Sequence, residues 1–177
     1  MKARDIFNFD NEKYKALRDP SRAVIEAYQN ANRFLDTIQE YVYIEQGMPY
    51  LANAIHKQAH KFPQRFDKFA DMLHERHLMA EYPETPEMDW REELKDLDNV
   101  FNTVIKVFDN INEALERMHA VTDNADFRAM ALFVENLMSE NSADYTKFIT
   151  AWVRWDEDGG SKTSFDSWCN KYFETEE

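Results

Sequence analysis

Apolar residues recur along this chain at intervals of three and four positions, the spacing that gathers them on one face of an α-helix. Four long stretches show this pattern, and it predicts helices over residues 20–46, 49–80, 87–120 and 125–155. The predicted inward positions are aliphatic and aromatic: Val24, Tyr28, Ala31, Leu35, Ile38 and Val42; Leu51, Ile55, Phe62, Phe66, Phe69 and Leu73; Leu94, Leu97, Phe101, Val104, Phe108, Ile111 and Leu115; and Met130, Val134, Leu137, Phe148 and Trp152. Four amphipathic helices of similar length favour a four-helix bundle.

Proline and capping residues predict where these helices begin. Asp19 is expected to cap the first helix, with Pro20 at its first position, and Pro49 is expected to open the second. Pro63 falls inside the second apolar pattern and predicts a kink or a split there. Thr85, followed by a proline, is expected to open the third helix.

The domain plan that follows is all-α. Residues 1–18 are predicted to form an N-terminal arm, residues 19–158 the bundle, and residues 159–177 a short fifth helix and tail. Thr163 and Asp166 have the spacing of a capping box, which predicts the start of that last helix.

Composition narrows the function classes. The 177 residues suffice for one domain, and three glycines with five prolines suit long helices. Cys169 is the only cysteine, so no internal disulfide is expected and a reducing compartment, the cytoplasm, is predicted. No apolar run is long enough to span a bilayer, and no secretory signal is recognised. The net charge of −13 argues against a nucleic-acid partner and suits small cations.

Residues that commonly bind metals form a stripe on the second predicted helix. They fall within an arc of about 100° on an ideal helix, roughly opposite its apolar face. The stripe consists of His56, His60, Asp67, Asp71, His74 and Glu75. These side chains are therefore predicted to point away from the bundle core.

The length of the stripe predicts a site shared between two chains. His60 and Asp71 are eleven residues apart, about 16 Å along a helix, so one metal ion cannot bind both in one chain. In a two-fold dimer with antiparallel copies of this helix, His56 and His60 of one chain would meet Asp71 and Glu75 of the other. The alternative is an ordinary solvated helix face without a metal.

The segment Asp71-Met-Leu-His-Glu75-Arg76 resembles the D-x-x-x-E-R helix end of the Dps-type mini-ferritins. His56-Lys-Gln-Ala-His60 lies in register with the family's H-x-x-x-D motif, and the resemblance extends over residues 22–155. It implies a ferritin-like four-helix bundle that oxidises iron(II) between two-fold-related subunits and stores the mineral in a hollow dodecamer. His56 would be the imidazole ligand, Asp71 and Glu75 the carboxylates, and His60 would replace the family's aspartate.

The sequence also departs from the family's pattern. The family's histidine near the end of the first helix is matched here by Ile44, and the adjacent Glu45 is the candidate substitute. A histidine at position 60 makes the ligand set richer in nitrogen, which would favour zinc or another divalent transition metal beside iron.

Two alternatives stay open. A di-iron site inside the bundle would need carboxylates facing the core, but Glu135 and Glu140 are predicted to point away from it, and His119 is interpreted as a hydrogen-bonded core histidine. The second alternative is a non-enzymatic ferritin-like protein whose stripe binds a structural metal or none.

Overall fold

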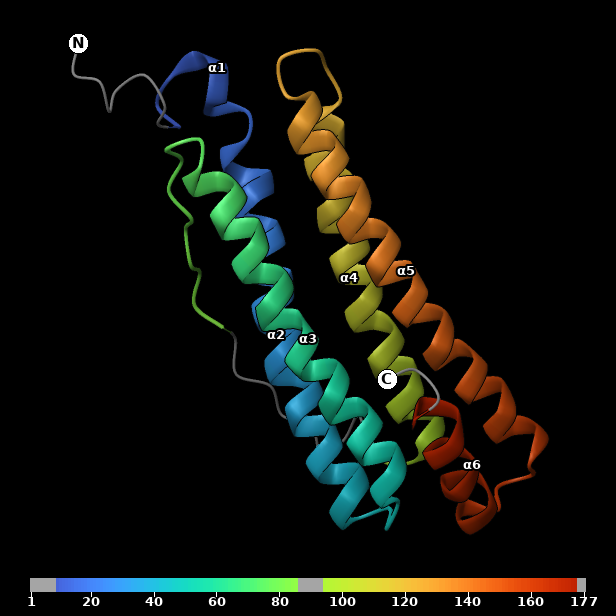
Figure 1. Ribbon diagram of the computed structural model, residues 1–177. Coiled ribbons are helices and arrows are strands. Elements are labelled where there is room, and N and C mark those ends of the chain that lie inside the picture. The colour runs from blue at the N-terminus through green and yellow to red at the C-terminus, as the bar shows by residue number, and fades with distance from the viewer. Residues whose placement is uncertain (1–8, 86–93, 175–177) are drawn as a thin grey trace.

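The computed structural model describes residues 9–85 and 94–174, and every regular element in these ranges is a helix (Figure 1). The elements in order are α1 (Glu12–Lys15), α2 (Arg18–Ile44), α3 (Pro49–His74), α4 (Leu97–Thr122), α5 (Arg128–Glu157) and α6 (Lys162–Glu174). The predicted all-α bundle with a short C-terminal helix is therefore confirmed.

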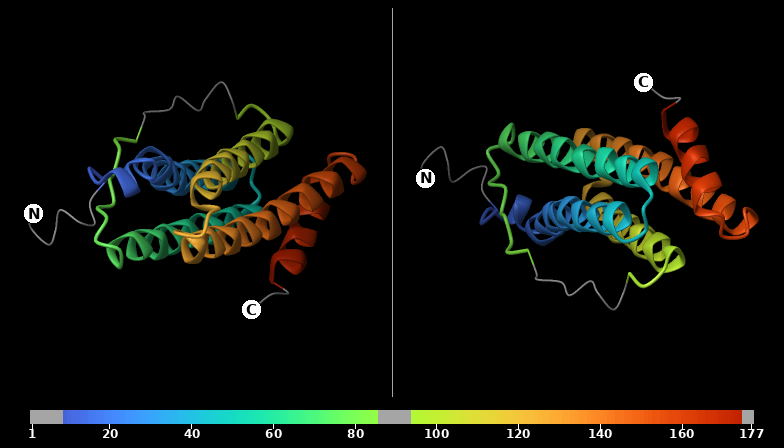
Figure 2. Two further views of the ribbon diagram at one scale, coloured as in Figure 1. Left: turned by 90° about the horizontal axis from the view of Figure 1, so that it is seen from above. Right: turned by 90° about the horizontal axis from the view of Figure 1, so that it is seen from below.

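The four long helices form two antiparallel hairpins joined by one long connection (Figure 1). α2 and α3 make the first hairpin, and α4 and α5 make the second. Since α3 ends at one end of the bundle and α4 begins at the other, these two helices run in the same direction. α2 packs closely against both α3 and α4, whereas α3 and α5 touch only sparsely and α6 packs against α3 (Figure 2).

The apolar faces predicted from the sequence form the core. All the inward positions are buried except Phe66 and Trp152, which are partly buried and pack against the rest. Phe108 lies at the centre of an aromatic cluster, with its ring 5.8 Å from that of Phe62 and 5.7 Å from that of Phe148. In the predicted N-terminal arm, Leu17 is fully buried against the bundle.

Helix starts differ from the sequence prediction. α2 begins at Arg18, so Asp19 is not its cap but lies in its first turn, where a carboxylate stabilises the helix dipole. α4 begins at Leu97, where Asp96 accepts a hydrogen bond from the backbone N–H of Asn99 at 2.8 Å. Part of the predicted start at residues 85–87 lies outside the described residues, but Leu94 is not helical. α5 likewise begins later than predicted, at Arg128.

α3 ends at His74, before the predicted end at Ala80. His77 takes a left-handed backbone conformation with φ of 55°, and the N–H of Leu78 donates to the carbonyl of Leu73 at 3.0 Å. This is a Schellman-type helix end, with a histidine at the position where glycine is usual. The chain then leaves the helix axis, so Glu75, the last residue of the predicted stripe, lies just past the end of α3.

The short helix α6 packs against the N-terminal end of α3. It begins at Lys162, so the predicted capping box at Thr163 and Asp166 is not its start. Asp166 is buried instead and accepts hydrogen bonds from the backbone N–H groups of Tyr50 at 3.1 Å and Leu51 at 2.9 Å. A residue of α6 thus provides the N-terminal cap of α3.

Candidate metal centre

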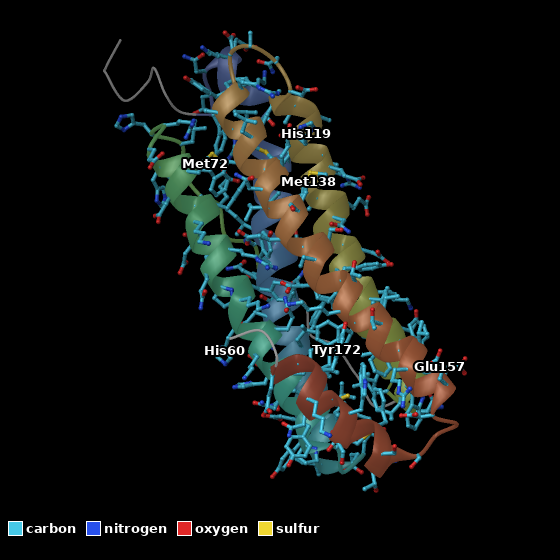
Figure 3. All side chains as sticks on the ribbon, turned by 45° about the vertical axis from the view of Figure 1, so that its right-hand side comes forward. His60, Met72, His119, Met138, Glu157 and Tyr172 are labelled. Atoms are coloured by element: carbon cyan, nitrogen blue, oxygen red, sulfur yellow. The ribbon has the colours of Figure 1, made fainter. Side chains whose placement is uncertain are left out.

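The structure places the predicted ligand stripe on the surface. His56, His60, Asp71 and Glu75 are exposed on α3 or at its end, and Figure 3 shows His60 on the outer side of that helix. Glu45 is exposed at the C-terminal end of α2. The outward direction inferred from the helical pattern is therefore confirmed.

Two of the predicted ligands come together, and a residue that the sequence analysis missed joins them. The rings of His56 and His60 lie edge to face with centroids 4.4 Å apart. Asp36 on α2 completes a group in which one ligand atom from each residue lies within 4.8 Å of the others. Within the described ranges this is the one cluster of three such residues, and Asp71, Glu75 and Glu45 do not belong to it.

Asp36 is held between the two helices. Its Oδ1 lies 3.5 Å from Nδ1 of His56. That oxygen is shielded from solvent and makes no hydrogen bond within the described part of the chain. Its other oxygen, Oδ2, accepts a long hydrogen bond of 3.4 Å from the side-chain amide of Asn32. A carboxylate oxygen without a donor, next to two imidazoles, suits a cation placed between them.

Asn32 also explains how α3 tolerates a proline in its middle. Pro63 has no N–H, so the carbonyl of Ala59 one turn earlier cannot receive its usual helical hydrogen bond. The side-chain amide of Asn32 donates to that carbonyl instead, at 3.1 Å. α3 is thus continuous from Pro49 to His74 rather than split, and the same asparagine connects the proline to Asp36.

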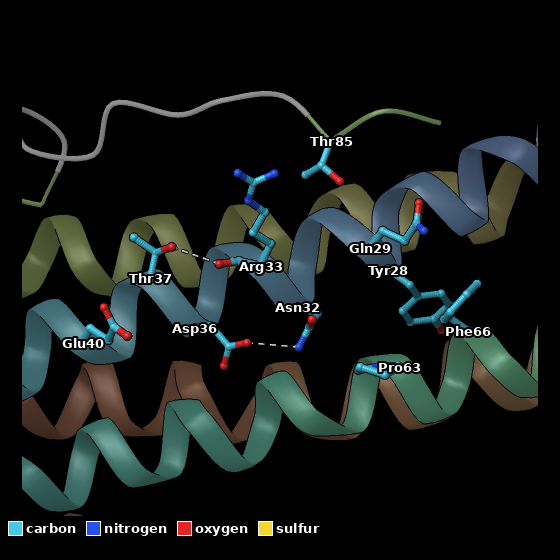
Figure 4. Close-up of a pocket in the computed structure, with 10 residues that line it drawn as sticks. All are labelled: Tyr28, Gln29, Asn32, Arg33, Asp36, Thr37, Glu40, Pro63, Phe66 and Thr85. Atoms are coloured by element: carbon cyan, nitrogen blue, oxygen red, sulfur yellow. Dashed lines mark hydrogen bonds between the residues drawn. The ribbon is translucent and has the colours of Figure 1, made fainter. Parts of the chain in front are cut away.

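A pocket of about 540 Å³ opens beside this group between α2 and α3 (Figure 4). Asp36, Asn32 and Pro63 line it together with Tyr28, whose hydroxyl is buried and has no hydrogen-bond partner in the described structure. Burial raises the pKa of Tyr28 above its ordinary value, so this phenol stays neutral near pH 7. The pocket gives water and small solutes room next to the Asp36 carboxylate.

The bundle interior holds a carboxylate that the sequence analysis did not find, Asp144, which is 3% exposed. Arg65 donates to it at 2.5 Å and Lys61 at 2.9 Å, while Arg65 also pairs with Glu140 at 2.9 Å. Burial by itself would raise the pKa of Asp144, but the Lys61 ammonium and the Arg65 guanidinium outweigh it and hold that pKa below its ordinary value. Because its oxygens already serve two cations, Asp144 is not arranged as an interior metal ligand.

His119 does not complete an interior site either. Its side chain is 27% exposed, and its Nε2 lies 3.0 Å from Oε1 of Glu135. It is therefore a hydrogen-bonded residue at the edge of the core rather than inside it.

No helix in the described ranges is long and apolar enough to cross a membrane.

Asp36 carried a weak signal in the sequence. Tyr28, Asn32 and Asp36 follow one another at intervals of four, which places them in a row along one edge of the apolar face of α2. Such a row meets the neighbouring helix, but the sequence alone does not say which residue of that helix it faces.

Comparison with protein-family models and with curated proteins gave no match to this chain.

Proposed function

We propose that this chain is a ferritin-like protein that binds iron(II) at an external site formed by Asp36, His56 and His60, oxidises it and stores the product. The single observation that carries the proposal is the convergence of these three side chains from two helices. The proposal assigns the protein to the cytoplasm, where a lone cysteine stays reduced.

The donor set suits this substrate. Two imidazoles and one carboxylate on one face are the ligands with which many proteins bind iron(II) while leaving further coordination positions open. The side chains of Asp36 and His56 are 42% and 46% exposed, so an ion can reach them from solvent. The net charge of −13 raises the local concentration of cations around the protein.

The topology also supports the proposal. A four-helix bundle with one long crossover between its second and third long helices is the arrangement that ferritin-like proteins use. Here the crossover joins α3 to α4, and the candidate ligands lie on the outer surface of the first hairpin.

A second copy of the chain would complete the site. Asp71 lies on the same helix as His56 and His60, and Glu75 lies just past its end, but neither belongs to the three-residue group. If two copies of α3 pack antiparallel about a two-fold axis, the carboxylates of one chain approach the imidazoles of the other, and each dimer holds two sites. Such dimers are the proposed unit of a larger oligomer, a dodecamer in the Dps-type family.

In the proposed reaction iron(II) is the substrate. Each ion gives one electron to dioxygen or peroxide, and two ions reduce one peroxide to two hydroxide ions. The chain's own residues hold the ion in place, and the two imidazoles bind it in their neutral form. Asn32 donates to Asp36 and keeps this carboxylate directed toward the histidines.

The experiment is an anaerobic iron(II) titration followed by addition of peroxide or air, with ferric absorbance as the signal. The wild-type chain is expected to give a rapid rise, and the variant His56→Ala/His60→Ala should give only the slow background. The matched control is His74→Ala, which removes an exposed histidine of α3 outside the three-residue group.

A normal rise in the double variant would overturn the proposed site. Binding of iron without oxidation would favour the second candidate, a non-enzymatic metal-binding bundle. Measuring particle size together with elemental analysis separates the two further, because iron storage requires a hollow oligomer loaded with metal.

A further inference from the structure

The outer face of α5 carries an uncharged stripe that follows most of the length of this helix, along the outer edge of the bundle (Figure 1). Its residues follow one another at alternating intervals of four and three positions, the heptad spacing of a helix that packs along another helix. All of them are exposed, because α5 packs against α4, α3 and α6 through its other positions. This α5 stripe consists of Leu132, Asn136, Ser139, Ala143, Thr146, Thr150 and Val153.

An exposed helix face without charge departs from the rest of this chain, in which 31% of the residues are charged. The outer faces of two other long helices show the ordinary pattern, with exposed Lys68 and Asp71 on α3 and exposed Lys106 and Glu113 on α4. Helix faces that meet only water are normally rich in such residues. The α5 stripe is therefore better suited to contact with another protein surface.

The α5 stripe is also more apolar than its residue types indicate. Leu132 and Val153, near its two ends, are 45% and 55% exposed. The hydroxyl of Thr146 donates to the carbonyl of Ser142, and that of Thr150 to the carbonyl of Thr146, both at 2.9 Å. Because these hydroxyls are bonded to their own helix, the threonine methyl groups remain for contact with a partner.

The order of residues along the α5 stripe is nearly the same from either end. Leu132 and Val153 are the large apolar residues at its ends, and Asn136 and Thr150 lie seven positions on either side of Ala143. The small side chain of Ala143 in the middle lets a second helix approach closely. A two-fold contact requires a surface that is complementary to itself, so the fitting occupant is the same face of a second copy, running antiparallel.

The charges just beyond the ends of the stripe favour the same arrangement. Arg128 precedes the stripe and Glu157 follows it, each about one turn away. Both lie in long, exposed ion pairs of their own chain, Arg128 with Asp123 and Glu157 with Arg154, each at 3.8 Å, and such pairs contribute little in water. Antiparallel copies bring Arg128 of one chain near Glu157 of the other, whereas parallel copies bring like charges together.

We propose that two copies of this chain associate through the α5 stripe, antiparallel about a two-fold axis near Ala143. This contact is separate from the contact through α3 that completes the iron site, since the two share no residue. A chain with both contacts forms assemblies larger than a dimer. The tests need no metal, so a failure of this contact is distinguishable from a failure of the iron site.

The first test is cross-linking of the full chain with a short bis-maleimide at single introduced cysteines. Cys169 is fully buried, so the wild-type chain is the blank. Ala143→Cys should cross-link to a second copy, because this position lies at the axis. Leu132→Cys should cross-link only when mixed with Val153→Cys, because its own two copies are about 32 Å apart in the antiparallel pair. Asn110→Cys, at an exposed position of α4, is the control for random collisions.

The second test is sedimentation of the full chain over a range of concentrations. Ala143→Glu should weaken self-association about tenfold or more, because it places two like charges at the axis. Asn110→Glu adds the same charge on α4 and should behave like the wild type. The proposal would be overturned by cross-linking of Ala143→Cys no stronger than that of Asn110→Cys, by equal cross-linking of Leu132→Cys alone, or by unchanged association of Ala143→Glu.

Discussion

The hydrogen bond from Asn32 to Ala59 can be tested by restoring the N–H that Pro63 lacks. In the wild-type chain the Asn32 amide donates to the Ala59 carbonyl at 3.1 Å, and Ala59 is fully buried. Asn32→Ala leaves that carbonyl without its side-chain donor. In a Pro63→Ala background the backbone N–H of residue 63 is available, so the Ala59 carbonyl keeps a donor after the same substitution.

The expected magnitude follows from the loss of a partner for a buried acceptor, about 1–3 kcal/mol. Because the amide is only partly buried, we expect the lower half of that range, about 1–2 kcal/mol. The gain in helix propensity from asparagine to alanine is the same in both backgrounds and cancels in a double-mutant cycle. The coupling free energy between positions 32 and 63 should therefore be about 1–2 kcal/mol.

The assay is urea unfolding of the four proteins of this cycle, followed by circular dichroism. A second cycle with Asn53→Ala, at an exposed asparagine of α3, is the control and should give no coupling. A coupling below about 0.5 kcal/mol at positions 32 and 63 would show that Asn32 does not replace the missing N–H, since unrelated sites already deviate by that much. Metal affinity gives a separate readout: Asn32→Ala should weaken it about tenfold in both backgrounds, because Asp36 loses its donor in each.

Three further results are expected. Asp144→Asn should destabilise the chain by about 3–5 kcal/mol, because it breaks a buried ion pair. The pKa of Asp144 is lowered in the folded chain, so the stabilisation from its charge is present above the ordinary pKa and is lost as pH falls below that value. The melting temperature of the variant should therefore depend less on acid pH than that of the wild type. Asp166→Ala should lower stability by about 1–2 kcal/mol and speed hydrogen exchange at Leu51, and unchanged exchange would show that this cap is dispensable. Zinc at one hundred times its dissociation constant should stabilise the wild type by about 2.7 kcal/mol and raise its melting temperature, and an equal rise in His56→Ala would place the metal elsewhere.

The helices and their buried faces were predictable because apolar residues recur along the chain at the spacing of a helix. An apolar residue every three or four positions reports the local helix and its inward side at once, so Leu35 and Phe101 could be placed without any partner in view. The outward direction of His56 and His60 followed from the same geometry. It needed only the angle between these residues and the apolar face.

The helix ends and the third ligand depended on contacts between helices. Asp166 has the spacing of a local cap but is used by α3, since α6 brings it against the free N–H groups there. Pro63 carries a local signal for a break, yet Asn32 from α2 supplies the missing donor. Asp36 became a candidate ligand only when α2 was packed against α3. The pattern within one helix does not show how α2 and α3 are aligned along each other.

The proposed iron site can be located in crystals grown anaerobically with iron(II) and measured at the iron absorption edge. We expect an anomalous peak between the Asp36 carboxylate and the imidazoles of His56 and His60, with Asp71 and Glu75 of a second copy of the chain nearby. A peak at another site, or none in crystals of a chain that oxidises iron in solution, would contradict it.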